Sequence, residues 1–249
     1  MTPTTVAGGT TGRRHFDWGA LYRPGKTAFL SYWKLIVGIQ LCAVTVVALY
    51  YTWPDFQTGC NWLADFKVRG GLLFTAIGTL ISGGVIPEVL KWKFRPAHLP
   101  KPTWGEIIHQ CAIFPICGII VDYFYKLQAV LFGTGTDVGT VALKILVDQL
   151  FFGPLVGIPI IITWFLFREL HYNPWRTLRQ WSVAFYVERG LPMYATALTY
   201  WPIMLVFIYA LPSALQFPLF LFANTAWSLI MVFIARRQVE AHKAVLLAQ

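Results

Sequence analysis

The chain has 249 residues, of which 57% are apolar and only 12% are charged, and its mean hydropathy is +0.57. Soluble domains carry about 25% charged residues, so this composition excludes a soluble globular protein and indicates an integral membrane protein. The net charge of +9 comes from short basic clusters between apolar runs. That pattern is typical of membrane topology and argues against a nucleic-acid partner.

The first 33 residues form a basic, polar N-terminal segment rich in Thr and Gly. It resembles an organellar targeting segment, or it is an ordinary basic tail in front of a first span. Residues 34–69 are predicted to hold an extra N-terminal span, from about Leu35 to Tyr51, and a loop. The aromatic side chains that end this span suit a membrane interface.

A second span is predicted from Gly70 to Leu90, with a kink near Pro87. Small residues let membrane helices approach closely, so this span should pack tightly on a neighbour. Its glycines are Gly70, Gly71, Gly78, Gly83 and Gly84.

The third and fourth spans are predicted over residues 108–132 and 141–167, as a helical hairpin whose polar turn centres on Gly135. Asp122 and Asp148 each lie 13 residues from Gly135, and Lys126 and Lys144 each lie 9 residues from it. Equal distance from the turn predicts equal depth. A rise of about 1.5 Å per residue puts the two aspartates roughly 12–15 Å deep, near the middle of a ~30 Å hydrocarbon layer.

Each aspartate is also four residues from a lysine on its own helix, the spacing at which helical side chains meet. The pattern therefore predicts one intramembrane cluster of four charges: Asp122, Lys126, Lys144 and Asp148, with Gln149 beside it. Charges at that depth must be paired or face a polar cavity. Two interpretations stay open, a lining for a solute or ion path and a set of salt bridges that fixes the hairpin register.

After the hairpin, Asn173 and Pro174 are typical of a helix start. Apolar Trp175, Leu178, Trp181 and Phe185 then recur at helical spacing. This indicates an amphipathic helix lying in the membrane interface, ended by Gly190 and Pro192.

The last apolar block is too long for one crossing. Two spans are predicted, Met193–Leu211 and Gln216–Ala235, with a break between them from Pro212 and Pro218. A re-entrant element is the alternative. Lys and Arg alternate between many and few in the successive loops, as the positive-inside rule requires for six crossings. The predicted fold is thus an all-α, polytopic transmembrane bundle of about six spans.

Enzymatic chemistry is not indicated. Cys42, Cys60, Cys111 and Cys117 form no Cys-x-x-Cys pair, so neither a disulfide framework nor a zinc site is expected. There is no Ser/His/Asp set with supporting turn chemistry and no phosphate loop. We expect no catalytic residue, no cofactor and no metal.

Several landmarks in the second half resemble the Mpv-seventeen / peroxisomal membrane protein family of small helical membrane proteins. The stretch Gly118–Tyr125 is similar to the family's Gly-Pro-x-x-His-x-Trp-Tyr. Asp148-Gln149 followed by Pro154 keeps its Asp-Gln and later Pro. The order Trp201, Pro202, Pro212, Trp227 is similar to its C-terminal Trp-Pro … Pro … Trp.

The resemblance covers residues 70–237 as an Mpv-like membrane domain, with 238–249 as a C-terminal tail. The chain also departs from the family at candidate pore-wall positions. The family's His is Asp122 here, its Gly-Asp is Gly83-Gly84, and its Gln and Asn after Trp-Pro fall near the apolar Leu205 and Ile208.

This resemblance implies a non-enzymatic membrane protein of the mitochondrial inner membrane, with peroxisomal and bacterial inner membranes as alternatives. The loss of polar wall positions favours an accessory subunit. Such a subunit would contact lipid and other membrane subunits through Phe/Trp-rich and Gly-rich faces, and a homo-oligomer is possible. The alternative function is a channel or pore for small solutes or ions.

Overall fold

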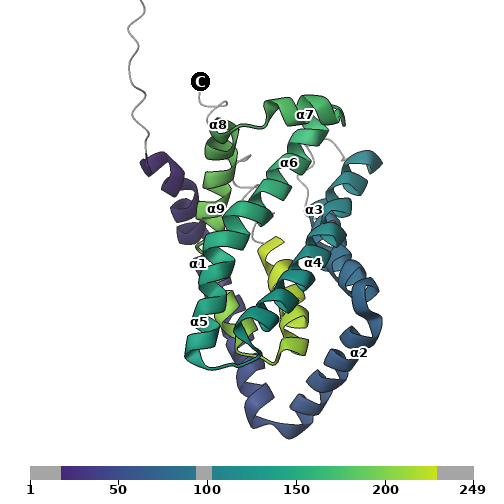
Figure 1. Ribbon diagram of the computed structural model, residues 1–249, viewed down its shortest axis with the longest axis vertical. Coiled ribbons are helices and arrows are strands. Elements are labelled where there is room, and N and C mark those ends of the chain that lie inside the picture. Colours follow the sequence, from purple (N-terminus) through teal and green to yellow (C-terminus); the bar gives the residue numbers. More distant parts are fainter. Residues whose placement is uncertain (1–17, 94–102, 229–249) are drawn as a thin grey trace, which may run out of the picture.

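The computed structural model describes residues 18–93 and 103–228, which form helices and turns with no strand. The long helices run roughly along the long axis of the molecule (Figure 1). The all-α prediction is therefore confirmed for these residues.

Residues 213–228 form the last described helix. The other elements are α1 (Trp18–Thr52), α2 (Pro54–Thr79), the π-helical turns η1 (Leu80–Val85), η2 (Asp148–Gly157) and η3 (Tyr186–Gly190), α3 (Ile86–Lys93), α4 (Trp104–Phe132), α5 (Val138–Val147), α6 (Ile158–Glu169), α7 (Pro174–Gln180), α8 (Val183–Phe185), α9 (Leu191–Ala197) and α10 (Trp201–Tyr209).

Three continuous helices in this part of the chain are long and apolar enough to cross a membrane: Pro54–Lys93, Trp104–Phe132 and Val138–Glu169. A fourth is obtained if Val183–Ala197 and Trp201–Tyr209, which meet at 54°, are taken as one broken span. Three or four candidate spans are consistent with an integral membrane protein. The count of six crossings stays a prediction.

The prediction of a loop before span two is wrong, because helix α2 begins at Pro54 and continues past Gly70. Proline suits the first turn of a helix, where its missing N–H has no intrahelical acceptor to bond. The helix kinks at Gly71, whose φ of 51° and ψ of −131° lie in a region that favours glycine. The domain boundary expected between residues 69 and 70 thus falls inside a helix, next to its kink. Likewise, residues 18–33 of the expected N-terminal segment belong to α1.

Two of the glycines of span two, Gly83 and Gly84, pack closely on α4. A Cβ atom added at Gly83 would lie 2.1 Å from the ring of Phe114, and one at Gly118 would lie 2.3 Å from the Thr79 hydroxyl. At these two points the neighbouring side chains leave no room for a Cβ atom, so only glycine fits without a shift. Close packing of this kind stabilises helix pairs where lipid removes the hydrophobic driving force.

The hairpin follows the prediction closely, with helices Trp104–Phe132 and Val138–Glu169. The side chain of Asp137 caps the second helix, because its Oδ1 accepts the backbone N–H of Thr140 at 3.0 Å. The second helix contains the wide turn η2, which includes Pro154. Proline has no N–H to donate, and π-helical turns are one way in which a helix accommodates that loss.

The single amphipathic helix predicted after Asn173 is wrong in its extent. It ends at Gln180, and Ser182 caps a new helical run that passes through Gly190 and Pro192 into α9. The wide turn η3 precedes Pro192 and gives its ring space, so these two residues do not stop the helix.

The last apolar block breaks where Pro212 predicted, between α10 and the helix 213–228. Pro218 does not contribute to this break, because it lies within the helix 213–228. A further bend after Ala197 separates α9 from α10. Residues 1–17, the predicted end of span six at Ala235 and the tail 238–249 lie outside the described residues.

Candidate functional site

Asp122 is the most completely paired charge in the described part of the helical hairpin. Only 2% of its side chain is exposed. Its Oδ1 lies 2.8 Å from Lys67 Nζ on α2, and its Oδ2 lies 2.7 Å from Lys126 Nζ on α4. The pair with Lys126 has the spacing expected from the sequence, whereas Lys67 was not foreseen because its segment read as a loop. Each carboxylate oxygen thus lies at ion-pair distance from a lysine nitrogen, although Oδ2 accepts no hydrogen bond, and the pair with Lys67 ties α2 to α4.

Exposed charged side chains surround the ion pairs of Asp122. Asp65 and Arg69 lie within one turn of Lys67 on α2 and are exposed, and 53% of the Lys126 side chain is exposed. Charged side chains that face lipid at the bilayer centre are costly. The mid-bilayer depth expected from helix length stays a prediction for Asp122, and at that depth these exposed neighbouring charges would be costly.

Asp148 has different partners. The hydroxyl of Tyr209 on α10 donates to its Oδ2 at 2.9 Å, and Gln149 Nε2 donates to its Oδ1 at 3.2 Å. The expected ion pair with Lys144 is not formed. Lys144 is 1% exposed, and its Nζ has no hydrogen-bond partner and lies 5.9 Å from the centre of the Tyr209 ring.

The four predicted charges therefore do not form one cluster: Asp122 pairs with α2, and Asp148 bonds to α10. Equal distance from the hairpin turn sets similar depth along two helices. It does not set the direction in which each side chain points around its helix axis. That direction depends on helices that the hairpin sequence does not contain.

The backbone of η2 accepts hydrogen bonds from two tyrosines, one on η3 and one on α9. The hydroxyl of Tyr186 donates to the carbonyl oxygen of Pro154 at 2.8 Å, and that of Tyr194 donates to the carbonyl oxygen of Gln149. A wide helical turn leaves carbonyl oxygens available for such bonds. These contacts fix Asp148 and Gln149 in place.

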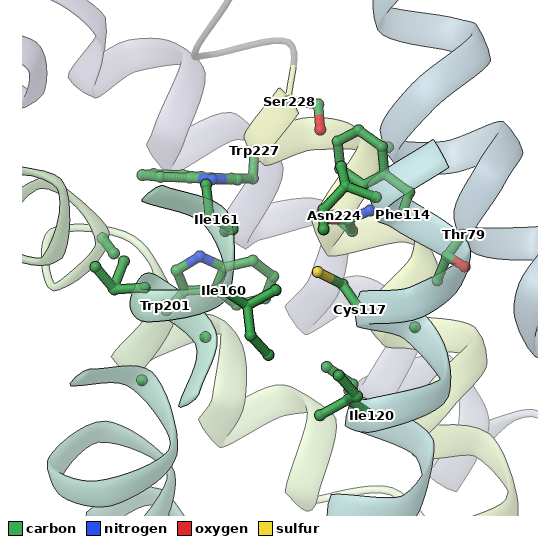
Figure 2. Close-up of a pocket in the computed structure, with 18 of the residues that line it drawn as sticks. Thr79, Phe114, Cys117, Ile120, Ile160, Ile161, Trp201, Asn224, Trp227 and Ser228 are labelled. Carbon is green, nitrogen blue, oxygen red and sulfur yellow. The ribbon is translucent and has the colours of Figure 1, made fainter. Parts of the chain in front are cut away.

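A cavity of about 490 Å³ lies beside Asp148, lined by residues of α2, η1, α3, α4, η2, α6, α9, α10 and the helix 213–228. Figure 2 shows it between Trp201, Trp227 and Ile160 on one side and Cys117, Phe114 and Asn224 on the other. Its walls are mostly apolar, as is usual for small-molecule sites. Six of the predicted polar-cluster and family-landmark residues line it: Gly118, Tyr125, Asp148, Gln149, Trp201 and Trp227.

The remaining landmarks of the family resemblance have structural contacts or positions outside the cavity. The carbonyl oxygen of Pro154 accepts from Tyr186, Pro202 lies in the first turn of α10, and Pro212 lies at the helix break. Tyr209 was missed by sequence reasoning, since it is one Tyr within a long apolar block. Its polar group, placed about 60 residues after Asp148, gave no signal by itself.

Among the described residues no group of three or more His, Cys, Asp or Glu is placed to hold a metal ion. The four cysteines are free thiols. Comparison with protein-family models, with curated proteins and with solved structures gives no match to this chain.

Proposed function

We propose that the protein is a non-enzymatic integral membrane protein of about six spans, and that it serves as an accessory subunit of a membrane complex. The observation that carries this proposal is that the two buried aspartates of the hairpin are bonded to other side chains of this chain. Each oxygen of Asp122 forms an ion pair with a lysine of this chain, and the two oxygens of Asp148 accept hydrogen bonds from Gln149 and Tyr209. Polar groups used in this way fix helix packing, the best-attested role of buried ionic groups.

The outer surface supports the same proposal. Trp62 and Phe66 on α2 are 68% and 53% exposed, and their rings stack with centres 5.7 Å apart. Aromatic side chains are enriched at protein interfaces, where they give large contact areas. We take this pair as the centre of a face for another membrane subunit. From the resemblance to Mpv-like proteins, the mitochondrial inner membrane is the proposed location.

Gentle isolation tests this function. After extraction in a mild detergent, native electrophoresis should show the protein in a larger assembly with other subunits. Replacing both Trp62 and Phe66 by Ala should release it from that assembly while its own melting temperature changes little. Trp175→Ala is the matched control, because that ring is 72% exposed but lies on α7. Migration of the wild type only as a monomer or small homo-oligomer would contradict the proposal.

A pore for small solutes or ions is the second candidate, favoured by the cavity that Asp148 and Gln149 line. A conducting path needs polar walls, and most of these walls are apolar. Reconstitution into a planar bilayer distinguishes the two functions. A pore predicts a conductance whose ion selectivity changes in Asp148→Asn and not in Asp65→Asn, a control on the exposed surface of α2. No conductance, or equal selectivity in both variants, would contradict a pore.

A further inference from the structure

Four aromatic rings from α4, α10 and the helix 213–228 follow one another along the cavity lining and form an aromatic wall. The ring centre of Trp201 lies 6.2 Å from that of Trp227 and 5.8 Å from that of Phe220. Phe220 lies 6.1 Å from Tyr125, and all four residues line the cavity. Trp201 and Trp227 both come from the second half of the chain and lie on the same side of the cavity in Figure 2. The face of an aromatic ring carries negative electrostatic potential.

A carboxylate ends this series. The Tyr125 ring packs 5.5 Å from that of Tyr209, whose hydroxyl donates to Asp148. Asp148 itself lines the cavity and is bound only by neutral donors in the described residues, with no Lys or Arg nitrogen within 4.0 Å. A buried carboxylate without a cation has lost its hydration without electrostatic compensation.

The other charged side chains near the cavity do not neutralise the negative charge of Asp148. Lys91 lies on its lining, but its Nζ is 2.6 Å from Glu88 Oε1, so this pair is neutral in sum. Lys144 is not among the lining residues, and its Nζ faces the ring of Tyr209. Within the described part of the chain, the cavity therefore combines one carboxylate without a bound cation and a long aromatic wall.

We propose that this cavity binds a lipophilic organic cation, of the quaternary ammonium or phosphonium type, with its charge near Asp148 and its apolar groups against the aromatic wall. Aromatic faces attract such cations, whose charge cannot donate an ordinary hydrogen bond, and the carboxylate supplies the counter-charge. The apolar walls bind the rest of the molecule, and a cavity of about 490 Å³ is in the range of small-ligand sites. This site goes beyond an accessory role and does not depend on it.

The test uses tetraphenylphosphonium and the purified full chain in nanodiscs of phosphatidylcholine. Equilibrium binding should saturate at one site per chain. Tetraphenylborate, which has the same shape and the opposite charge, should bind much more weakly at that site. Removing the counter-charge in Asp148→Asn should weaken tetraphenylphosphonium binding by roughly tenfold or more, the size of one close ion pair in a partly buried site. Asp65→Asn makes the same chemical change on the exposed face of α2 and should leave binding unchanged.

Two further variants keep the outcome informative where Asp148→Asn fails to fold. Trp201→Leu removes a ring but no charge, and should weaken tetraphenylphosphonium binding a few-fold. Tyr209→Phe removes a neutral donor from the carboxylate but leaves its charge, so binding should persist. The proposal is overturned if the phosphonium and the borate bind equally, if tetraphenylphosphonium does not bind the wild type, or if Trp201→Leu and Asp148→Asn both match Asp65→Asn.

Discussion

The contact between α4 and α2 at Gly118 gives the sharpest test of the packing. A Cβ atom there would lie 2.3 Å from Thr79 Oγ1, 2.4 Å from its Cγ2 and 2.8 Å from its Cβ. Thr79 cannot move aside easily, because it is 1% exposed and its hydroxyl donates to the carbonyl oxygen of Thr75 at 2.8 Å. Gly118→Ala must therefore push the two helices apart or displace that side chain.

The expected cost follows from opposing effects. Overpacking a tight interface destabilises by about 1–3 kcal/mol. The higher helix propensity of Ala offsets up to about 1 kcal/mol of this. For a chain of this size each kcal/mol shifts the melting temperature by roughly 2–4 °C. We therefore expect Gly118→Ala to melt several degrees below the wild type in detergent.

Gly105→Ala is the matched control, since it lies near the start of α4 and its Cβ would meet only Thr103 Oγ1 at 4.0 Å. It should be neutral or slightly stabilising. Thr79→Ala removes the two closest atoms, so the double variant with Gly118→Ala should recover part of the loss and show non-additive melting temperatures. Equal stability of the Gly118→Ala and Gly105→Ala variants, or strict additivity, would refute the close approach described above.

Three other predictions concern charges and caps, and thermal melting in detergent checks each one. Lys67→Met should destabilise more than Lys126→Met, because Lys67 is the more buried partner of Asp122. Its cost should stay below the roughly 3–5 kcal/mol of a buried charge left alone, since the other lysine remains; equal effects would contradict this order. Asn173→Ala should cost about 1 kcal/mol through loss of the α7 cap, and no change would mean that the cap is unimportant. A hydrogen bond from the backbone N–H of residue 140 lowers the pKa of Asp137, so its stabilising effect is present at neutral pH and is lost as acid protonates it below about pH 4. Asp137→Asn keeps a cap and should therefore lose less stability between pH 7 and pH 3 than the wild type; identical pH profiles would contradict this.

Local signals in the sequence predicted a large part of the fold. The apolar runs, the turn at residues 133–137 and the break at Pro212 are recovered in the structure. These signals are strong because lipid leaves the backbone no partners except those within its own helix, so a long apolar run must be helical. The extent of helix 54–93 was missed because its first half carries charges that resemble a loop.

The candidate site was likewise predicted only in part from the sequence. Composition and hydropathy predicted an integral membrane protein, with which the long apolar helices are consistent, and the spacing pattern included three charges that are buried: Asp122, Lys144 and Asp148. Only the tertiary structure decided their partners: Asp122 turns to Lys67 and Asp148 turns to the side of Tyr209 and the cavity. The physical reason is that the distance from the turn fixes how deep a residue lies along its helix. Which partner its side chain meets depends on the helix that packs against that face, and that helix is distant in the sequence.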